Sequence, residues 1–265
     1  LAGRALTDPP GRVVLINGIG LDHEGFRDAL QSLALPMNAG RYPYGGWDHL
    51  AVTVPGFEDA LQRLREPLLG MDQQAERLAS FLARDPVAST VLYGFSYGSD
   101  LAVEVLERVL GRVPVVRVVL AELNVRPESC FITRRMAESY EAALDLGQGR
   151  HQQAYAGFVS RVMRAYAEGR LDRALMQDMT LYFKTIARKD WHQLARCARE
   201  VSADPESRAR RLWTRLGTHP EVPCELVFSD PKDLVAAQRL QSEHGAPENI
   251  HVRDATARGH FWHMS

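Results

Sequence analysis

The chain has 265 residues, of which 45% are hydrophobic and 25% are charged, and its formal net charge is -1. This length suits one α/β domain with an insertion as well as it suits two domains. The near-neutral charge argues against a nucleic-acid-binding protein, which needs a basic surface to neutralise phosphates. No segment reaches the roughly 20 apolar residues of a membrane helix, and the N-terminal region lacks a signal-peptide core. We therefore expect a cytoplasmic protein with neither a nucleic-acid nor a membrane partner.

The cysteines predict no disulfide and no metal site. Cys130, Cys197 and Cys224 are widely separated, and no pair has the close spacing of a redox or zinc motif. Their simplest role is that of small buried side chains in a reducing compartment. We expect no metal and no organic cofactor.

Predicted strands and helices alternate along most of the chain. Between short β-branched runs lie segments such as Met71–Ala83 and Leu101–Leu110, each with one apolar face. Alternation of this kind predicts βαβ units, and hence an α/β fold with a mostly parallel twisted sheet flanked by helices. The predicted strands are Arg12–Asn17, His49–Val54, Ser89–Tyr93, Val115–Leu120, Cys224–Phe228 and Asn249–Arg253.

The alternation stops after residue 125 and resumes at Val222, and the stretch between reads as helical throughout. A helical block between two strands of one sheet predicts an inserted all-helical cap, or lid. We therefore predict a core made of residues 1–125 and 218–265, with the cap formed by residues 126–217.

The pentapeptide Gly94–Gly98 (Gly-Phe-Ser-Tyr-Gly) follows a predicted strand and precedes a predicted helix. A nucleophilic serine needs this context, because the strained turn leaves no room for side chains two positions before and after it. The helix that follows favours developing negative charge at its N-terminus. The pattern predicts that Ser96 is a nucleophile.

A serine hydroxyl needs a base to remove its proton. Of the nine histidines, His260 stands in a Gly-His-Phe sequence just after the last predicted strand. In a parallel sheet this position lies at the same edge as Ser96. We predict His260 as the base, with His263 as the alternative.

A carboxylate must orient the imidazole of the base and stabilise its protonated form. Asp230 and Asp233 both follow the predicted strand Cys224–Phe228. Asp233 precedes a helical segment and could instead be its N-cap, whereas Asp230 precedes a proline and could instead form an Asx turn. We predict Asp233 as the acid, with Asp230 as the alternative and Glu122 as a third candidate.

The order of Ser96, an acid after a later strand, and His260 resembles the α/β-hydrolase superfamily, over about residues 12–125 and 218–263. The resemblance implies the α/β-hydrolase fold with a Ser-Asp-His triad. One departure concerns the acid: the spacing to Asp233 is one residue longer than usual if Ser229 marks the small residue of the family pattern. For this reason the choice between the two aspartates stays open.

A second match to the family is Ile16–Gly20 (Ile-Asn-Gly-Ile-Gly), at the end of the first predicted strand. Asn17 stands where the family usually has histidine. The resemblance implies that the backbone N–H groups of Ile19 and Tyr97 form an oxyanion hole, and backbone donors tolerate a change of side chain.

These features predict a serine hydrolase that cleaves an ester or thioester with a mainly apolar acyl group, free or carrier-bound, through an acyl-Ser96 intermediate. The alternatives are carbon–carbon bond hydrolysis, acyl transfer or cyclisation by the same triad, and a non-catalytic ligand-binding member of the fold. We expect Phe95, Trp262 and Asn17 to line the substrate pocket. The arginines of Arg208–Arg211 are predicted to form a solvated helix face.

Overall fold

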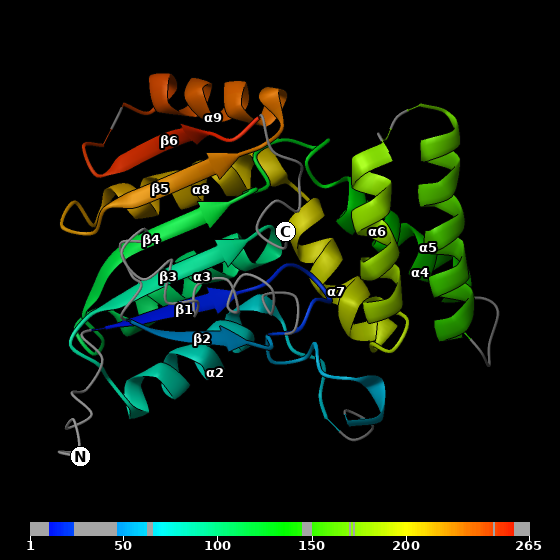
Figure 1. Cartoon of the computed structure of the whole chain (residues 1–265), viewed down its shortest axis with the longest axis horizontal. Helices are drawn as coiled ribbons and strands as arrows, with labels where there is room; N and C mark the ends of the chain where they lie inside the picture. The colour runs from blue at the N-terminus through cyan, green and yellow to red at the C-terminus, as the bar shows by residue number, and fades with distance from the viewer. Residues whose placement is uncertain are drawn as a thin grey trace, which may run out of the picture.

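The computed structural model describes residues 11–23, 47–62, 66–144, 150–169, 171, 173–245 and 247–256. In this part of the chain, six strands form one sheet in the order β2-β1-β3-β4-β5-β6, and every neighbouring pair is parallel. Figure 1 shows the strands pointing the same way, so that their carboxyl ends meet at one edge. The strands are β1 (Arg12–Ile16), β2 (Asp48–Val52), β3 (Thr90–Phe95), β4 (Val115–Ala121), β5 (Cys224–Phe228) and β6 (Ile250–Asp254).

The prediction of a mostly parallel sheet is confirmed, and each strand lies within two residues of its predicted bounds. The interior strands β1 and β3 are almost wholly buried, because helices cover both faces of a parallel sheet. Pairing of Ile16 with Gly94, and of Phe95 with Ala121, brings three strand ends side by side.

Helices from both halves of the chain cover the sheet. Helix α3 packs against β1, β3 and β4 and buries Leu101, Val105 and Leu106 completely. It ends at Val109 with Leu110 as its C-cap, and Gly111 follows with a φ of 77°, the left-handed conformation that favours glycine after a helix. The sheet-flanking helices are α2 (Met71–Arg84), α3 (Tyr97–Val109), α8 (Pro205–Gly217) and α9 (Pro231–Glu243).

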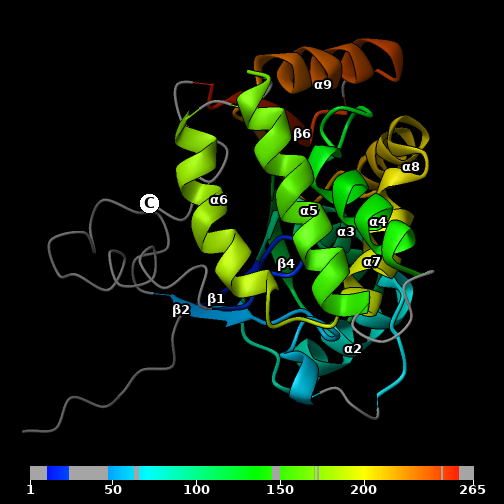
Figure 2. The same ribbon diagram turned by 90° about the vertical axis from the view of Figure 1, so that its right-hand side faces the viewer.

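A second group of helices lies between β4 and β5 in the chain and stands at the carboxyl edge of the sheet (Figures 1 and 2). Helix α8, in contrast, lies beside α3, where Arg215 donates to Glu104 at 2.6 Å and to Glu107. The predicted cap boundary at residue 217 stays a prediction. The helices at the carboxyl edge are α4 (Phe131–Ala143), α5 (Arg150–Ala167), α6 (Arg173–Ile186) and α7 (Trp191–Ser202).

Among the side chains that join helix α7 to the sheet-bearing part of the chain, the buried Gln193 makes two short hydrogen bonds. The amide of Gln193 accepts from the backbone N–H of Leu69 at 2.8 Å and donates to its carbonyl at 2.6 Å. This side chain pairs with the backbone of Leu69 as a neighbouring strand would. Asp190 caps the helix by accepting from the backbone of His192.

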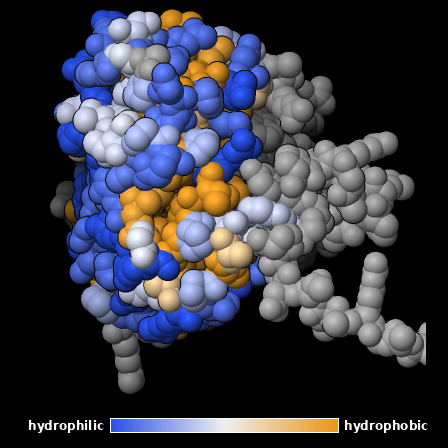
Figure 3. Space-filling view, turned by 90° about the vertical axis from the view of Figure 1, so that its left-hand side faces the viewer, coloured by the Kyte–Doolittle hydropathy of each residue, from blue (hydrophilic) through white to orange (hydrophobic). Residues whose placement is uncertain are grey.

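Figure 3 shows the opposite end of the molecule, where the strands begin. Apolar side chains gather there within a hydrophilic surround. Val116, at the start of β4, is among the exposed large hydrophobic residues of the described chain. No helix in the described part is long and apolar enough to span a membrane.

Replacement of Gly98 by alanine is expected to lower the free energy of unfolding by more than about 3 kcal/mol. A Cβ at this position would overlap the carbonyl oxygen of Ile16 at the end of β1, and backbone cannot move aside cheaply. Urea denaturation measures the loss. Gly157, in the middle of α5, is the matched control, because a Cβ there meets only ordinary contacts, so Gly157→Ala should stabilise by a few tenths to about 1 kcal/mol.

Candidate active site

The residue between β3 and α3 is Ser96, and its backbone is strained. Its φ of 51° and ψ of -118° lie in a region that side-chain-bearing residues rarely adopt. The turn is held by Ser99, whose hydroxyl lies 2.9 Å from the carbonyl of Gly94 and 2.8 Å from that of Ala121. The structure thus places Ser96 on a sharp strand-to-helix turn, at the N-terminus of α3.

The loop after β1 is tied down by its own asparagine. Asn17 is fully buried, accepts from the N–H of Gly18 at 2.8 Å and donates to the carbonyl of Asp22 at 3.1 Å. Asp22 in turn binds the buried ammonium group of Lys189 at 3.3 Å. The side chain of Asn17 therefore supports the loop from within, and the pocket described below is lined by its neighbours.

The two predicted oxyanion donors are both available. Among the described residues, the backbone N–H groups of Ile19 and Tyr97 have no hydrogen-bond acceptor. Tyr97 is the first residue of α3, where N–H groups have no partner within the helix. Its side chain points away into the core, where its hydroxyl donates to Gln74 at 2.5 Å. Burial raises the pKa of Tyr97, so this hydroxyl stays protonated.

Tyr182, in α6, binds the loop after β1 that carries Ile19, called the oxyanion loop below. Its hydroxyl donates to the carbonyl of Ile19 at 2.9 Å, and its side chain is buried. This bond holds the carbonyl group of Ile19, and thereby the orientation of the peptide unit that joins Ile19 to Gly20. Helix α6 and the loop after β1 are therefore joined directly above the candidate site.

Replacement of Tyr182 by phenylalanine is expected to lower kcat about tenfold while KM changes little, because a loosened oxyanion loop acts mainly on the transition state. Steady-state kinetics with an activated ester measure both constants. Tyr166→Phe is the control, since Tyr166 lies partly exposed on α5. A rise in KM at constant kcat would show that the Tyr182 hydroxyl serves substrate binding alone.

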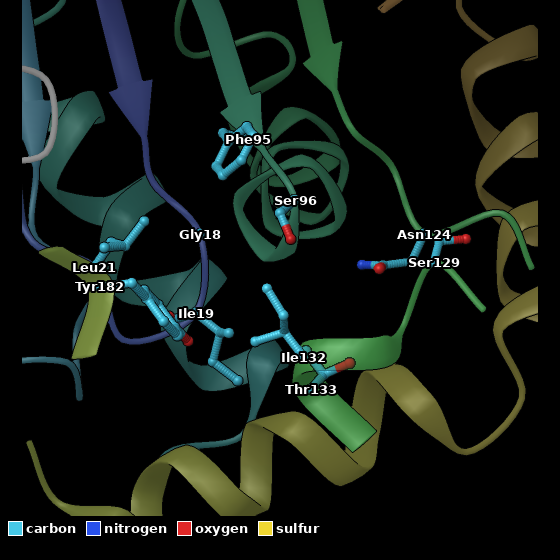
Figure 4. Close-up of a pocket in the computed structure, with 10 residues that line it drawn as sticks. All are labelled: Gly18, Ile19, Leu21, Phe95, Ser96, Asn124, Ser129, Ile132, Thr133 and Tyr182. Atoms are coloured by element: carbon cyan, nitrogen blue, oxygen red, sulfur yellow. The ribbon is translucent and has the colours of Figure 1, made fainter. Parts of the chain in front are cut away.

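A pocket lies between the carboxyl ends of β1, β3 and β4 and the helices α4 and α6 (Figure 4). Its empty volume is about 360 Å³, part of it open to solvent. Ser96 stands at its centre in this view, with Leu21 and Tyr182 on one side and Asn124 on the other. The pocket is lined by Gly18, Ile19, Leu21, Phe95, Ser96, Asn124, Ser129, Ile132, Thr133 and Tyr182.

Asp233 lies buried in the first turn of α9, close to the pocket wall. Its carboxylate accepts from the guanidinium of Arg126 and, at 3.2 Å, from the hydroxyl of Ser129, which itself lines the pocket. Burial raises the pKa of Asp233 to about 6, although Arg126 acts in the opposite direction. At neutral pH the carboxylate is therefore mainly ionised, as the orienting acid of a triad must be.

Asp230, and not Asp233, is the N-cap of α9. It accepts from the N–H of Lys232 at 2.7 Å as the N-cap of α9, which begins at Pro231, and it also binds Arg126 at 3.0 Å. Proline suits the first helical position, so the helix starts three residues earlier than predicted. The alternative N-cap role of Asp233 is therefore wrong, and its predicted role as the triad acid stays a prediction.

Glu122 directly follows β4 and is the second non-glycine residue with a positive φ, 55°, in the described chain. Its buried carboxylate accepts from the N–H of Ser229 at 2.8 Å. It therefore links the ends of β4 and β5 beside the candidate site. The two strained non-glycine residues of the described chain, Ser96 and Glu122, thus stand at the ends of adjacent strands.

Three of the predicted site residues, His260, His263 and Trp262, lie outside the described residues. Phe95 and Ile19 line the same pocket as Ser96, Tyr97 follows Ser96 in the chain, and Asn17 is not among the lining residues. Within the described ranges, no group of three or more His, Cys, Asp or Glu side chains is placed to hold a metal ion.

A buried series of polar side chains next to the Ser96 turn was not predicted from the sequence. Arg208, predicted to lie on a solvated helix face, binds Asp100 at 2.7 Å, and its side chain is only 14% exposed. Asp100 is fully buried and accepts from Asn124 at 3.1 Å. Asn124 carried one usable signal, because polar residues just beyond the carboxyl end of a parallel strand often face a ligand.

The structure thus combines a parallel α/β sheet with a strained serine turn and two backbone donors without an acceptor. Residues 13–265 match the model of the alpha/beta hydrolase family. The chain belongs to this family, which confirms the resemblance seen in its sequence. It is an enzyme of the alpha/beta hydrolase class.

Solved structures share this fold at low sequence identity. MenH from S. aureus is 15% identical with a TM-score of 0.63, over 99% of this chain and 91% of that one. A structure from a study of carboxylesterases of the thaumarchaeon Nitrososphaera gargenis is 13% identical with a TM-score of 0.59, over 95% and 82%. A mutant of the N-acyl homoserine lactonase AidH, complexed with N-hexanoyl homoserine, is 15% identical with a TM-score of 0.53, over 96% and 82%. No curated protein sequence matches the chain.

Proposed function

We propose that this protein is a serine hydrolase that cleaves an ester or thioester with a mainly apolar acyl group through a covalent acyl-Ser96 intermediate. The observation that carries the proposal is the position of Ser96: a strained turn at a helix N-terminus, inside a pocket and beside two unpaired backbone N–H groups. Carboxylesterases and a lactonase among the structural neighbours act on bonds of the same class.

The proposed triad completes this site with two residues from the end of the chain. His260 is the base and Asp233 the acid that orients it. Residues 1–125 and 218–265 form the hydrolase core, and the helices within 126–217 form a cap that selects a small-molecule acyl substrate. Ile19, Leu21, Phe95 and Ile132 give the pocket an apolar lining suited to an acyl chain.

The chemistry follows from these parts. His260 takes the proton of Ser96 as the hydroxyl oxygen attacks the carbonyl carbon, and the N–H groups of Ile19 and Tyr97 hold the oxyanion. Collapse of the tetrahedral intermediate breaks the bond to the alcohol or thiol, which leaves with the proton from His260. A water molecule then gives its proton to His260 and attacks the acyl carbon. The acid is released, and Ser96 regains its proton.

A fluorophosphonate probe tests the nucleophile. We expect one phosphonyl group per chain, formed as the serine oxygen displaces fluoride, and peptide mapping should place it on Ser96. Esters of graded acyl length should then be hydrolysed to free acids. A folded protein, judged by far-UV circular dichroism, that takes up no probe would overturn the proposal in favour of ligand binding.

Product analysis tests the reaction type. Strong labelling of Ser96 without hydrolysis of any ester in the series would overturn the simple hydrolase. The same triad would then have to act in acyl transfer, cyclisation or carbon–carbon bond cleavage.

A further inference from the structure

The side chain of Asn124 has a fixed orientation. It lies two residues beyond Glu122, only 2% exposed, and its amide nitrogen donates to the carboxylate of Asp100 at 3.1 Å. The other oxygen of this carboxylate accepts from Arg208 at 2.7 Å. A carboxylate so paired can only accept hydrogen bonds, so the NH₂ group of Asn124 must face it.

The amide oxygen of Asn124 is then left facing the pocket. It has no hydrogen-bond partner among the described residues, and Figure 4 shows the amide end of the side chain pointing toward the middle of the pocket. The oxygen is not one of the sealed, unpartnered side-chain oxygens of the described chain, so it opens onto the free volume of the pocket. A fixed acceptor that opens onto a pocket is a position where a ligand can supply the donor.

The other polar side chains of the wall do not offer donors. The one proton of the Ser129 hydroxyl is shared between two acceptors, the carbonyl of Arg126 at 2.9 Å and the carboxylate of Asp233 at 3.2 Å, and the hydroxyl of Thr133 donates to the carbonyl of Cys130 at 3.0 Å. As described above, Tyr182 commits its proton to the oxyanion loop. Apart from Ser96 and the second N–H of Asn124 itself, the described side chains of this wall present lone pairs and no spare proton.

We infer that Asn124 is a specificity-determining residue that accepts a hydrogen bond from a neutral donor of the substrate, a hydroxyl or an amide N–H. The inference rests on the proposed function and narrows its substrate class. A substrate whose matching group is a carboxylate is disfavoured, because among the described lining residues there is no cation and the acceptor of Asn124 would repel it. Asp100 and Arg208 act through Asn124 as positioning residues.

Paired esters test this role. In one series a hydroxyl is moved along the acyl chain, in the other along the alcohol, and each compound is matched by its methyl ether. We expect the wild type to prefer at least one hydroxyl compound over its ether by about tenfold or more in kcat/KM, since sites built around a buried polar group reject analogues without the donor. In Asn124→Leu the ratio should fall to about one.

The ratio of two kcat/KM values does not depend on the fraction of active protein, so partial misfolding of the variant does not obscure it. Ser139→Ala, which removes a buried hydroxyl of α4 outside the pocket lining, should keep the wild-type ratio. Wild-type ratios near one at every position, with ester hydrolysis and Ser96 labelling intact, overturn the role of Asn124 alone. Absence of both hydrolysis and labelling overturns the proposed function instead.

Discussion

Ser96→Ala is expected to lower kcat on the order of 10⁶-fold, the loss seen when a serine nucleophile is removed from a triad. The substitution leaves the backbone turn in place, because Ser99 and not Ser96 supplies the side-chain bonds that hold it. The variant should therefore fold, and its residual rate should come from the oxyanion donors and the pocket. Ester hydrolysis and probe labelling measure the change. Ser80→Ala is the control, because it removes only an exposed hydrogen bond from Ser80 to Glu76 on α2.

The base is tested in the same assay. His260→Ala should reduce kcat about as far as Ser96→Ala does, because residues of a triad act as one unit. His263→Ala should keep most of the activity. If instead His263→Ala removes activity and His260→Ala spares it, the assignment of the base is wrong. A Ser96→Ala protein that hydrolyses esters at the wild-type rate would place the nucleophile elsewhere.

The second large effect concerns the acid. Asp233→Asn is expected to lower kcat on the order of 10⁴-fold, because a neutral amide neither holds the imidazole in the required tautomer nor stabilises its protonated form. The asparagine oxygen can still accept from Arg126 and Ser129, so the fold around α9 should persist. Thermal unfolding measured beside kcat separates a catalytic loss from a structural one.

Two further carboxylate-to-amide variants serve as controls for Asp233→Asn. Asp230→Asn keeps an N-cap, since asparagine caps as well as aspartate, and it should leave kcat and stability nearly unchanged. Glu122→Gln can still accept from Ser229, so it removes only the charge. A 10⁴-fold loss in either of these variants, with Asp233→Asn fully active, would move the acid to that residue.

The sheet could be predicted closely from the sequence because its signals are local. Short β-branched runs, amphipathic helices and the glycines around Ser96 each act within a few neighbouring residues. The Asp-Pro pair at Asp230 was also a local signal: Asp230 accepts from the N–H of Lys232 two residues on, as in the Asx turn given as its alternative role, and the helix begins at Pro231.

The walls of the site could not be predicted in the same way. Asp100, Asn124 and Arg208 form one polar chain although Arg208 stands 108 positions after Asp100. An arginine in an exposed-looking run gives no sign of such a partner until the helices are packed. Tyr182 is one of many aromatic residues between β4 and β5, and only the fold shows which of them reaches the oxyanion loop.

The pairing of Gln193 with Leu69 has a consequence for protein engineering. Because the amide of Gln193 satisfies both backbone groups of Leu69, exchange of the whole helical insertion for that of another family member would leave a buried N–H and carbonyl unpaired. A chimera with its second junction placed before Asp190 keeps α7 with its N-cap and replaces only α4 to α6. For grafting a new substrate preference, α7 therefore belongs to the scaffold.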